Sequence, residues 1–427
     1  MNEELLHYIW KFQLFNHQDL KLTSGESFQV IRSGIHNTDS GPDFFNGQVK
    51  IDSTKWAGNI EIHTLSSHWF QHKHQEDETY DRIILHVVWE DDKPVLQANG
   101  NLVPTIELKG LVNKTILEKF EVLHKTKAWI PCENYIHTID RLVKIQAIDR
   151  NLISRLEQKS SRIDQILKLT KNDWEATLYQ LLAKSFGFKV NSVPFELLAA
   201  SIDFSKVRKL QQNEEQLSSL FFGQAGFLEQ EWKGSYPISL QEQYQFLKNK
   251  YQLEALNVSI WKFMRMRPSN FPSIRIAQFV ALFHQNKNLF QAVLESEKLT
   301  DLKKLFEVEA NHYWKSHYRF DVPASKNAIK KLGEASIHIL LINSVIPLLF
   351  NYGKRIGNEV LVERAVQLLQ GLPPERNAIT KKWRELDVIA QSAYDSQALI
   401  ELKNNQCSNK KCLTCAVGSS ILKTSRE

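Results

Sequence analysis

The feature that most constrains the fold of this chain is a change in the spacing of its apolar residues near residue 125. Before that point, short segments rich in β-branched and aromatic residues alternate with Gly, Asn and Asp, which is typical of strands joined by turns. After it, apolar residues recur every three or four positions, which is typical of amphipathic helices. The sequence therefore predicts an α/β domain over residues 1–125 and a larger all-α domain over residues 126–427.

Within the first domain we expect an opening helix at residues 3–15 and a short helix at about residues 66–79. The segments expected to form strands are 27–34, 47–52, 55–65, 81–90 and 102–108. The predicted order over residues 3–91 is therefore helix, three strands, helix and strand.

The composition favours a folded, soluble, cytoplasmic protein. Of the 427 residues, 42% are hydrophobic, and the N-terminus has neither a basic region nor a small-residue cleavage site that would mark a secretory signal. The longest apolar run, residues 337–350, is shorter than the roughly 18 residues of a membrane span, so we expect a buried helix and no membrane partner. A formal net charge of +6 permits binding to nucleic acid without requiring it.

Acidic groups and a histidine follow one another on two predicted strands. Asp43, after Pro42, opens the first of these strands, and Glu61 and His63 lie two residues apart on the next, so both point to one face. If the strands are neighbours, Asp43 and Glu61 converge on a Mg or Mn ion and His63 positions the attacking water. Lys50, on the first of the two strands, is a candidate for the cationic group. The alternative is that Asp43 caps a turn and Glu61 forms a surface ion pair.

A second polar cluster, His72, His74 and Asp77, follows at once. Imidazole and carboxylate ligands together suit Zn, Mn or Fe. The same residues also fit an exposed helix face. His86 interrupts an apolar strand, so we expect it to be buried and to need a polar partner.

Three of the four cysteines, Cys407, Cys412 and Cys415, form a C-x4-C-x2-C cluster near the C-terminus. Close thiols in a cytosolic protein point to a metal rather than to disulfides. A tetrahedral thiolate site needs four ligands, and Cys132 is the remaining thiol. A zinc ion or a [4Fe-4S] cluster would satisfy this set; the alternative is that the thiols are core residues.

Basic and aromatic residues alternate from Trp261 to Arg275. Arg265, Arg267 and Arg275 are candidates for contacts with the phosphates of a nucleic acid. The alternative is a rigid loop between helices whose arginines pair with acids. No phosphate-binding GxxxxGK, no GxGxxG and no GxSxG is present, which leaves ATP-driven work and serine hydrolase chemistry without support.

The order Pro42-Asp43, then Glu61-x-His63, resembles the restriction-endonuclease-like superfamily, whose signature is PD-(D/E)xK. The resemblance implies an N-terminal domain of that fold, with Asp43 and Glu61 as ligands of Mg or Mn and His63 in the place of the lysine. Some nucleases of that superfamily hold an iron–sulfur cluster with one early cysteine and a C-terminal triplet. In those enzymes the first cysteine precedes the nuclease motifs, whereas Cys132 follows them.

Taken together, the GPDF…GNIEIH…HKH block, the FMRMRP loop and the terminal cysteines resemble an uncharacterised bacterial family carried as a domain of unknown function. That resemblance implies a shared fold without an activity. The residues lead to the hypothesis of a metal-dependent nuclease acting on DNA. Two alternatives stay open: a non-catalytic nucleic-acid-binding protein with a degenerate nuclease fold, and a small-molecule hydrolase whose metal is held by His63, His72, His74 and Asp77.

Overall fold

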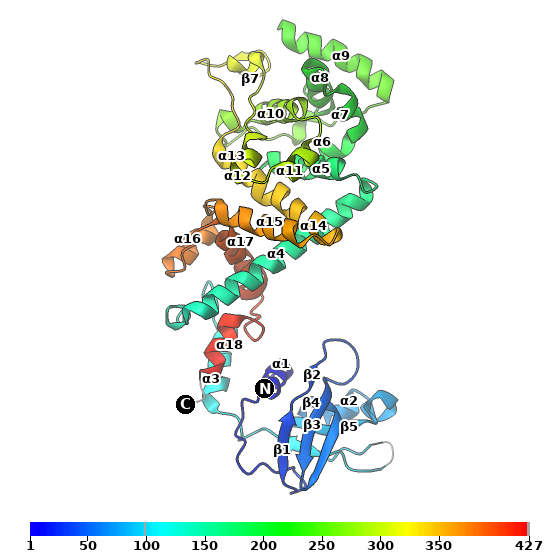
Figure 1. The fold of residues 1–427 in the computed structure, drawn as a ribbon, viewed down its shortest axis with the longest axis vertical. Helices are drawn as coiled ribbons and strands as arrows, with labels where there is room; N and C mark the ends of the chain where they lie inside the picture. The colour runs from blue at the N-terminus through cyan, green and yellow to red at the C-terminus, as the bar shows by residue number, and fades with distance from the viewer. Residues whose placement is uncertain (98–99, 425–427) are drawn as a thin grey trace. The chain divides into compact units, whose positions relative to one another are not determined.

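The computed structural model describes residues 1–97 and 100–424, which form two compact units (Figure 1). The sheet unit comprises residues 1–149 together with residues 402–427, and the helical unit comprises residues 150–401. The division between the two units falls inside the helix α4 (Arg141–Leu169), after residue 149, rather than near the expected residue 125. The C-terminal segment with its three cysteines belongs to the sheet unit rather than to the helical one.

A mixed sheet organises the first unit, in the order β1-β3-β4-β5-β6, with β2 paired to β3. β1, β3 and β4 are antiparallel neighbours, whereas β5 runs parallel to β4, and β6 runs parallel to β5. The strands are β1 (Phe28–Arg32), β2 (Ile35–His36), β3 (Phe44–Ile51), β4 (Thr54–Leu65), β5 (Ile83–Glu90) and β6 (Thr105–Glu107).

The middle of β4 is buried on both faces. Ile60 and Ile62 point to one face and Glu61 and His63 to the other, and all four side chains are buried. Parallel strands such as β4 and β5 are usually apolar throughout, since both faces of the sheet are covered. Two adjacent polar side chains at this position are therefore an exception that requires a partner.

Helices cover the sheet and connect its strands. The helix α1 (Glu3–Lys11) buries Leu5, Leu6, Ile9 and Trp10 and carries acids in its first turn, where the helix dipole favours them. Between β4 and β5 lie α2 (His68–Gln71), η1 (His74–Glu76) and η2 (Glu78–Tyr80). The remaining elements of this unit are α3 (Lys114–Lys125), η3 (Ile136–Thr138), η8 (Leu402–Cys407) and α18 (Ala416–Lys423).

The second unit is helical apart from a small hairpin of β7 (His317–Arg319) and β8 (Val322–Pro323). Its core contains a cluster of tilted and edge-on aromatic rings that includes Tyr179, Phe221 and Phe279. Its helices after α4 are α5 (Trp174–Phe186), α6 (Ser192–Ser201), α7 (Phe204–Leu210), α8 (Glu214–Gln224), α9 (Ser235–Tyr251), η4 (Val258–Ile260), η5 (Pro268–Asn270), α10 (Pro272–Gln285), α11 (Leu289–Glu295), α12 (Leu299–Lys304), η6 (His312–Lys315), α13 (Glu334–Leu340), η7 (Leu341–Val345), α14 (Ile346–Arg355), α15 (Glu359–Gly371), α16 (Ala378–Glu385) and α17 (Ala393–Glu401).

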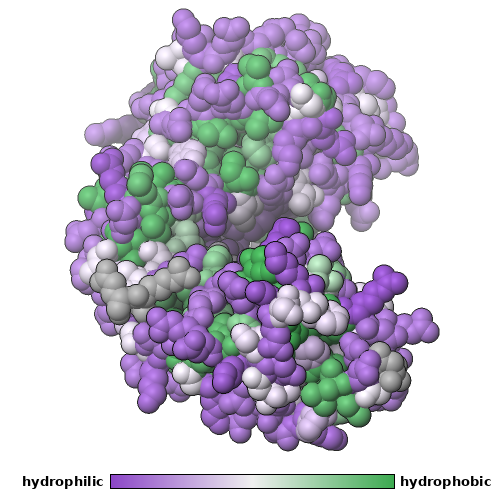
Figure 2. Space-filling view, turned by 60° about the horizontal axis from the view of Figure 1, so that its bottom comes forward, coloured by the Kyte–Doolittle hydropathy of each residue, from purple (hydrophilic) through white to green (hydrophobic). Residues whose placement is uncertain are grey.

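The described elements confirm an N-terminal region built on a mixed sheet followed by a helical region. The apolar run at residues 337–350 lies in a continuous helix, Glu334–Arg355, which is long enough to cross a membrane. Of its apolar window, 67% is buried inside the protein, as in a core helix. Polar residues cover most of the face shown in Figure 2, and apolar residues appear there in scattered areas.

Candidate metal centre

Asp43, just before β3, and Glu61, on the neighbouring strand β4, lie close together. The backbone N–H of Asp43 donates to Glu61 Oε2 over 3.2 Å, and the N–H of Ile62 donates to Asp43 Oδ2 over 2.9 Å. These two bonds fix both carboxylates against the sheet, as the order of the residues on neighbouring strands predicts. The other oxygen of Glu61 faces a group of histidines.

Three imidazoles form a chain on the same face of the sheet. His63 Nδ1 lies 2.9 Å from Nε2 of His86, and His63 Nε2 lies 3.1 Å from Nδ1 of His72. His86 is thus buried and partnered, as expected, although the partner is another imidazole rather than an acid. The Nδ1 atom of His86 has no hydrogen-bond partner among the described residues.

The contacts around His63 have the spacing of ligands around one ion. The ligand nitrogens of His63, His72 and His74 all lie within 4.8 Å of one another. Glu61 Oε1 lies 3.2 Å from His74 Nε2 and 3.7 Å from His63 Nε2. Metal–nitrogen bonds of about 2.0–2.1 Å at tetrahedral angles place neighbouring ligand atoms about 3.3 Å apart. The contact between His74 and Glu61 is close but is not aligned as a hydrogen bond, which is how two ligands of one ion approach each other.

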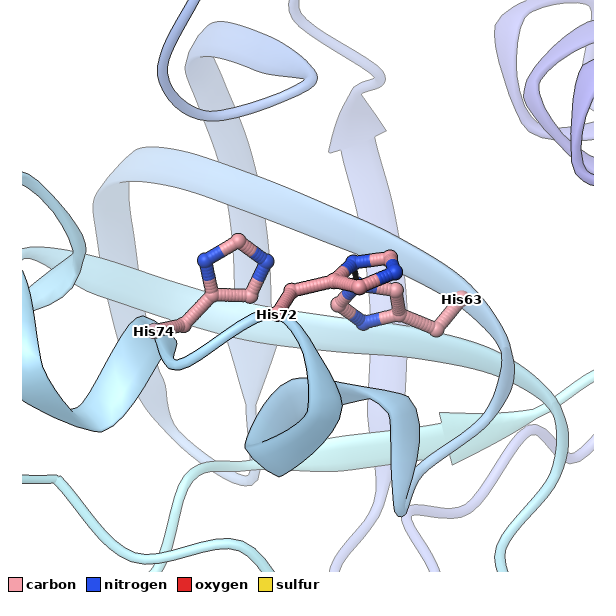
Figure 3. A group of neighbouring side chains, drawn as sticks. All are labelled: His63, His72 and His74. Atoms are coloured by element: carbon pink, nitrogen blue, oxygen red, sulfur yellow. Dashed lines mark hydrogen bonds between the residues drawn. The ribbon is translucent and has the colours of Figure 1, made fainter.

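A turn in a strained backbone conformation brings two of these histidines together. Lys73, between His72 and His74, has φ of 61°, in the left-handed region that few non-glycine residues adopt. It separates the end of α2 from the start of η1, so that the two imidazoles reach His63 from the same loop (Figure 3). His63 is buried, His74 is half-buried and His72 is exposed, so the group extends from the sheet to the solvent.

Electrostatics make this cluster costly without a cation. Burial, with the neighbouring carboxylate of Asp43, raises the pKa of Glu61 to about 9. Burial and the surrounding imidazoles lower the pKa of His63 well below its ordinary value, so that ring stays neutral at neutral pH and offers a lone pair. A divalent cation among these groups would offset both effects, since it favours the ionised carboxylate and the neutral imidazole.

A second group of ligands lies on the other side of Asp43. Glu3 and His7, four residues apart on α1, bring their ligand atoms within 4.8 Å of the Asp43 carboxylate, and His7 Nε2 lies 3.2 Å from Asp43 Oδ2. Burial acts against the charged form, yet the Asp43 carboxylate raises the pKa of His7 above its ordinary value. Sequence reasoning missed both residues; their signal was the spacing of four, which places them on one face of the helix.

Two of the candidate residues do not join the centre. Lys50 is paired with Lys55 near the far end of β3, about 20 Å along the strand from Asp43, because each strand residue advances the chain by about 3.3 Å. It cannot supply the missing cationic group. Asp77 is exposed and accepts hydrogen bonds from the backbone N–H and the hydroxyl of Thr79, which makes it the N-cap of η2 rather than a ligand beside His74.

The three candidate arginines line one cavity of about 500 Å³ in the helical unit, together with Lys189. Arg265 and Arg267 are exposed and form no ion pair among the described residues. Arg275 differs, since it is buried, donates to Asn270, Gln278 and Ser336, and packs its guanidinium against Phe188 at 4.4 Å. Because Arg275 is buried and both of its Nη atoms donate within the protein, the expectation of a direct phosphate contact is not met by this residue.

All four cysteines gather at one cavity of the sheet unit. Cys132 lines it from the segment after α3, and Cys407, Cys412 and Cys415 line it from the C-terminal segment. No disulfide joins them. A four-thiolate site required Cys132 to meet the other three cysteines across the whole helical region of the sequence. The four cysteines do meet, at this cavity.

The chain belongs to the family described as protein of unknown function (DUF2851), whose profile matches residues 3–378. This match covers most of both units and agrees with the resemblance carried by the GPDF block and the FMRMRP loop. Comparisons with curated proteins and with solved structures found no match.

Proposed function

We propose that the sheet unit is a divalent-metal-dependent phosphodiesterase that acts on nucleic acid in the cytoplasm. The observation that carries the proposal is the convergence of His63, His72 and His74, whose ligand nitrogens lie within 4.8 Å of one another, with Glu61 Oε1 only 3.2 Å from His74 Nε2. Asp43 and His7 stand next to it, within reach of Glu61. These groups combine metal ligands with an acid–base pair, which is what phosphodiester hydrolysis requires.

The ligand set favours Mn²⁺ or Zn²⁺ over Mg²⁺. Mg²⁺ prefers oxygen ligands and retains several waters, whereas three of the four candidate ligands here are imidazoles. The proposed ion is therefore held differently from the Mg or Mn ion that two carboxylates alone would bind. When bound, the ion would polarise a phosphoryl oxygen and lower the pKa of a water.

The protein groups around the ion divide the remaining work. His86 Nε2 would accept a hydrogen bond from Nδ1–H of His63. The lone pair on Nε2 of His63 would then be left for the ion, an outer-shell arrangement common to histidine ligands. His7, whose pKa is raised by Asp43, would hold a proton near neutral pH and give it to the leaving oxygen. Tyr80 stacks on His74 with ring centroids 3.8 Å apart and fixes that ring.

The fold supports the same proposal. α1, β1, β3, β4, the short helices and β5 follow the order helix, three strands, helix and strand that the restriction-endonuclease-like superfamily implies. Asp43 precedes the second of these strands, and Glu61-x-His63 lies on the third. We propose that the unit is a variant of that fold in which imidazoles replace the lysine.

Cleavage assays with metal-free and reconstituted protein test the proposal. The full chain is incubated with single- and double-stranded DNA, RNA and bis(p-nitrophenyl) phosphate, with Mn²⁺, Zn²⁺ or Mg²⁺. We expect Mn²⁺- or Zn²⁺-dependent cleavage that falls more than about 100-fold in Glu61→Gln, beyond the loss that outer-shell partners cause. The control Glu76→Gln changes an exposed glutamate of the same loop and keeps its activity. No cleavage by the unchanged chain, or full activity in Glu61→Gln, would contradict the proposal.

A nucleic-acid substrate is favoured by the basic cavity of the helical unit. Arg265, Arg267 and Lys189 contribute three cations to one concave surface, and phosphate contacts of this kind dominate affinity for nucleic acid. The double change Arg265→Ala with Arg267→Ala should weaken DNA binding and reduce the salt slope by about 2. The charge-matched control Lys168→Ala with Lys381→Ala removes two exposed lysines from helices and leaves the slope nearly unchanged.

The assays also separate the alternatives. Salt-dependent DNA binding without product would favour a non-catalytic nucleic-acid-binding protein. Cleavage of small phosphate esters, without cleavage of DNA or RNA, would favour a small-molecule hydrolase. In that hydrolase Glu61, rather than the expected Asp77, would be the carboxylate ligand beside His74.

A further inference from the structure

The four cysteines of the chain are separated by up to 283 residues, from Cys132 to Cys415, yet they line a single cavity. The cavity lies within the sheet unit, because the C-terminal segment returns to that unit. Cys132 and Cys412 are buried, and the other two thiols are half-buried. If the thiols were only core residues, nothing would require all four cysteines of the sequence to line the same cavity.

The backbone around the thiols is shaped for close approach. Lys410, with φ of 52°, begins the turn that carries Cys412, and Cys415 is the N-cap of α18. A Cβ atom added at Gly418 would lie 2.2 Å from the carbonyl oxygen of Cys412, so the turn presses against α18 at a position that only glycine permits. The backbone N–H groups of Tyr135 and Ile136 both donate to the carbonyl of Cys132 and fix its side of the cavity.

The four thiols at this cavity match the ligand number of a tetrahedral zinc site and of a [4Fe-4S] cluster. Zn–S bonds of about 2.3 Å would place tetrahedral sulfurs about 3.8 Å apart. A [4Fe-4S] cluster binds each thiolate to a different iron and therefore holds the sulfurs farther apart.

We propose that Cys132, Cys407, Cys412 and Cys415 bind a [4Fe-4S] cluster that fastens the C-terminal segment to the sheet unit. The cluster would join the chain after α3 to η8 and to the N-terminus of α18. Burial raises the pKa of Cys132 to about 12 and that of Cys412 to about 11, so the thiols without the cluster stay protonated and binding releases protons.

The position of α18 gives the cluster a second consequence. The hydroxyl of Tyr8 lies 2.8 Å from the hydroxyl of Ser419 on α18 and 3.2 Å from its carbonyl. Tyr8 follows His7 on α1, the helix that faces Asp43. The cluster would thus hold α1 in place through α18 without contacting the candidate metal centre.

Anaerobic purification of the full chain tests the proposal. We expect about four iron and four acid-labile sulfide per chain, with a broad visible absorption that bleaches on reduction. Cys412→Ser and Cys132→Ser should each lose most of the iron and the colour, whereas Glu61→Gln should keep both. This last control distinguishes failure of the cluster from failure of the proposed phosphodiesterase site.

Three results would overturn the cluster. One zinc per chain in a colourless protein would replace it with a single ion, and a metal-free chain with four titratable thiols would remove the site. Iron retained in Cys132→Ser would exclude that residue as a ligand. Because a variant that fails to fold loses metal for another reason, the metal content and spectrum of the unchanged chain decide the proposal on their own.

Discussion

The helical unit and the sheet unit both bury charged side chains, but they satisfy them differently. In the helical unit, Arg155 lies 3.6 Å from Glu401 and donates to Gln397, which in turn donates to Glu375. Lys159 donates to Gln397 over 3.1 Å, and also to Asn343 and to the carbonyl of Ile342. Arg155 thus faces the carboxylates of Glu375 and Glu401 within one network, which also holds Lys159, whose pKa burial lowers to about 7.

The sheet unit buries Glu61 beside another carboxylate, and its nearest polar neighbours are neutral imidazoles. No described lysine or arginine forms an ion pair with Glu61 or Asp43. A network whose opposite charges face each other is explained by folding alone, whereas a buried carboxyl packed among neutral imidazoles is a candidate metal site. This difference is the reason for placing the metal in the sheet unit.

The largest expected effect is a difference in the free energy of unfolding between variants of the two networks. Glu401→Gln leaves the half-buried Arg155 without its full charge partner, and we expect it to lower the free energy of unfolding by about 3 kcal/mol. In metal-free protein, Glu61→Gln replaces a carboxyl that a pKa of about 9 keeps protonated at neutral pH, so stability should stay nearly equal. Urea unfolding of both variants measures the contrast. Equal losses would show that the two regions are built alike.

A second change probes the outer shell of the metal centre. His86→Leu removes the partner of His63 Nδ1 and should weaken Mn²⁺ or Zn²⁺ binding by about 10- to 100-fold. Val87→Ala, on the next residue of β5 and the opposite face, is the matched control and should leave affinity within a few-fold. Titration calorimetry compares them. Unchanged affinity in His86→Leu would show that His63 is not oriented by this bond.

A third prediction concerns Glu175, a half-buried carboxylate of the helical unit that accepts from the N–H of Phe290. Burial raises its pKa to about 7, above the ordinary value of 4.5. Between these two pH values the folded state therefore binds more protons than the unfolded state. The contribution of Glu175 to stability is fully present below pH 4.5 and is lost as pH rises through about 7. Glu175→Gln should flatten this part of the profile by on the order of 1 kcal/mol. A profile identical to that of the unchanged chain would contradict the assignment.

The smallest effect is expected at Lys50. Because it lies at the far end of β3, Lys50→Ala should change kcat/KM for phosphodiester cleavage by less than about twofold, within the range of surface changes. A large loss would mean that β3 and β4 pair in a different register, and it would reopen the comparison with enzymes that use a lysine.

Much of this molecule follows from local pattern. The alternation of residues 55–65 and the three-to-four spacing of residues 141–169 predict β4 and α4, and the two-residue step from Glu61 to His63 predicts their shared face. These properties depend on the geometry of one element, and a single sequence carries them.

The remaining features depend on contacts between distant elements. The register of β3 against β4 sets Lys50 apart from Asp43, and the left-handed conformation of Lys73 sets His72 beside His63. Neither has a signal in the local spacing. The burial of Arg275 likewise arises from acceptors on three segments, so the basic stretch alone could not separate it from Arg265.

The most direct test of the central claim is a count of Mn²⁺ bound after equilibrium dialysis of the full chain. The unchanged chain is compared with the double variant Glu61→Gln with His72→Ala, since the thiolates prefer softer metals and do not compete for Mn²⁺. The account predicts about one ion at the sheet unit, held by nitrogen and oxygen ligands and absent from the variant. Equal binding by the two proteins, or none by either, would contradict it.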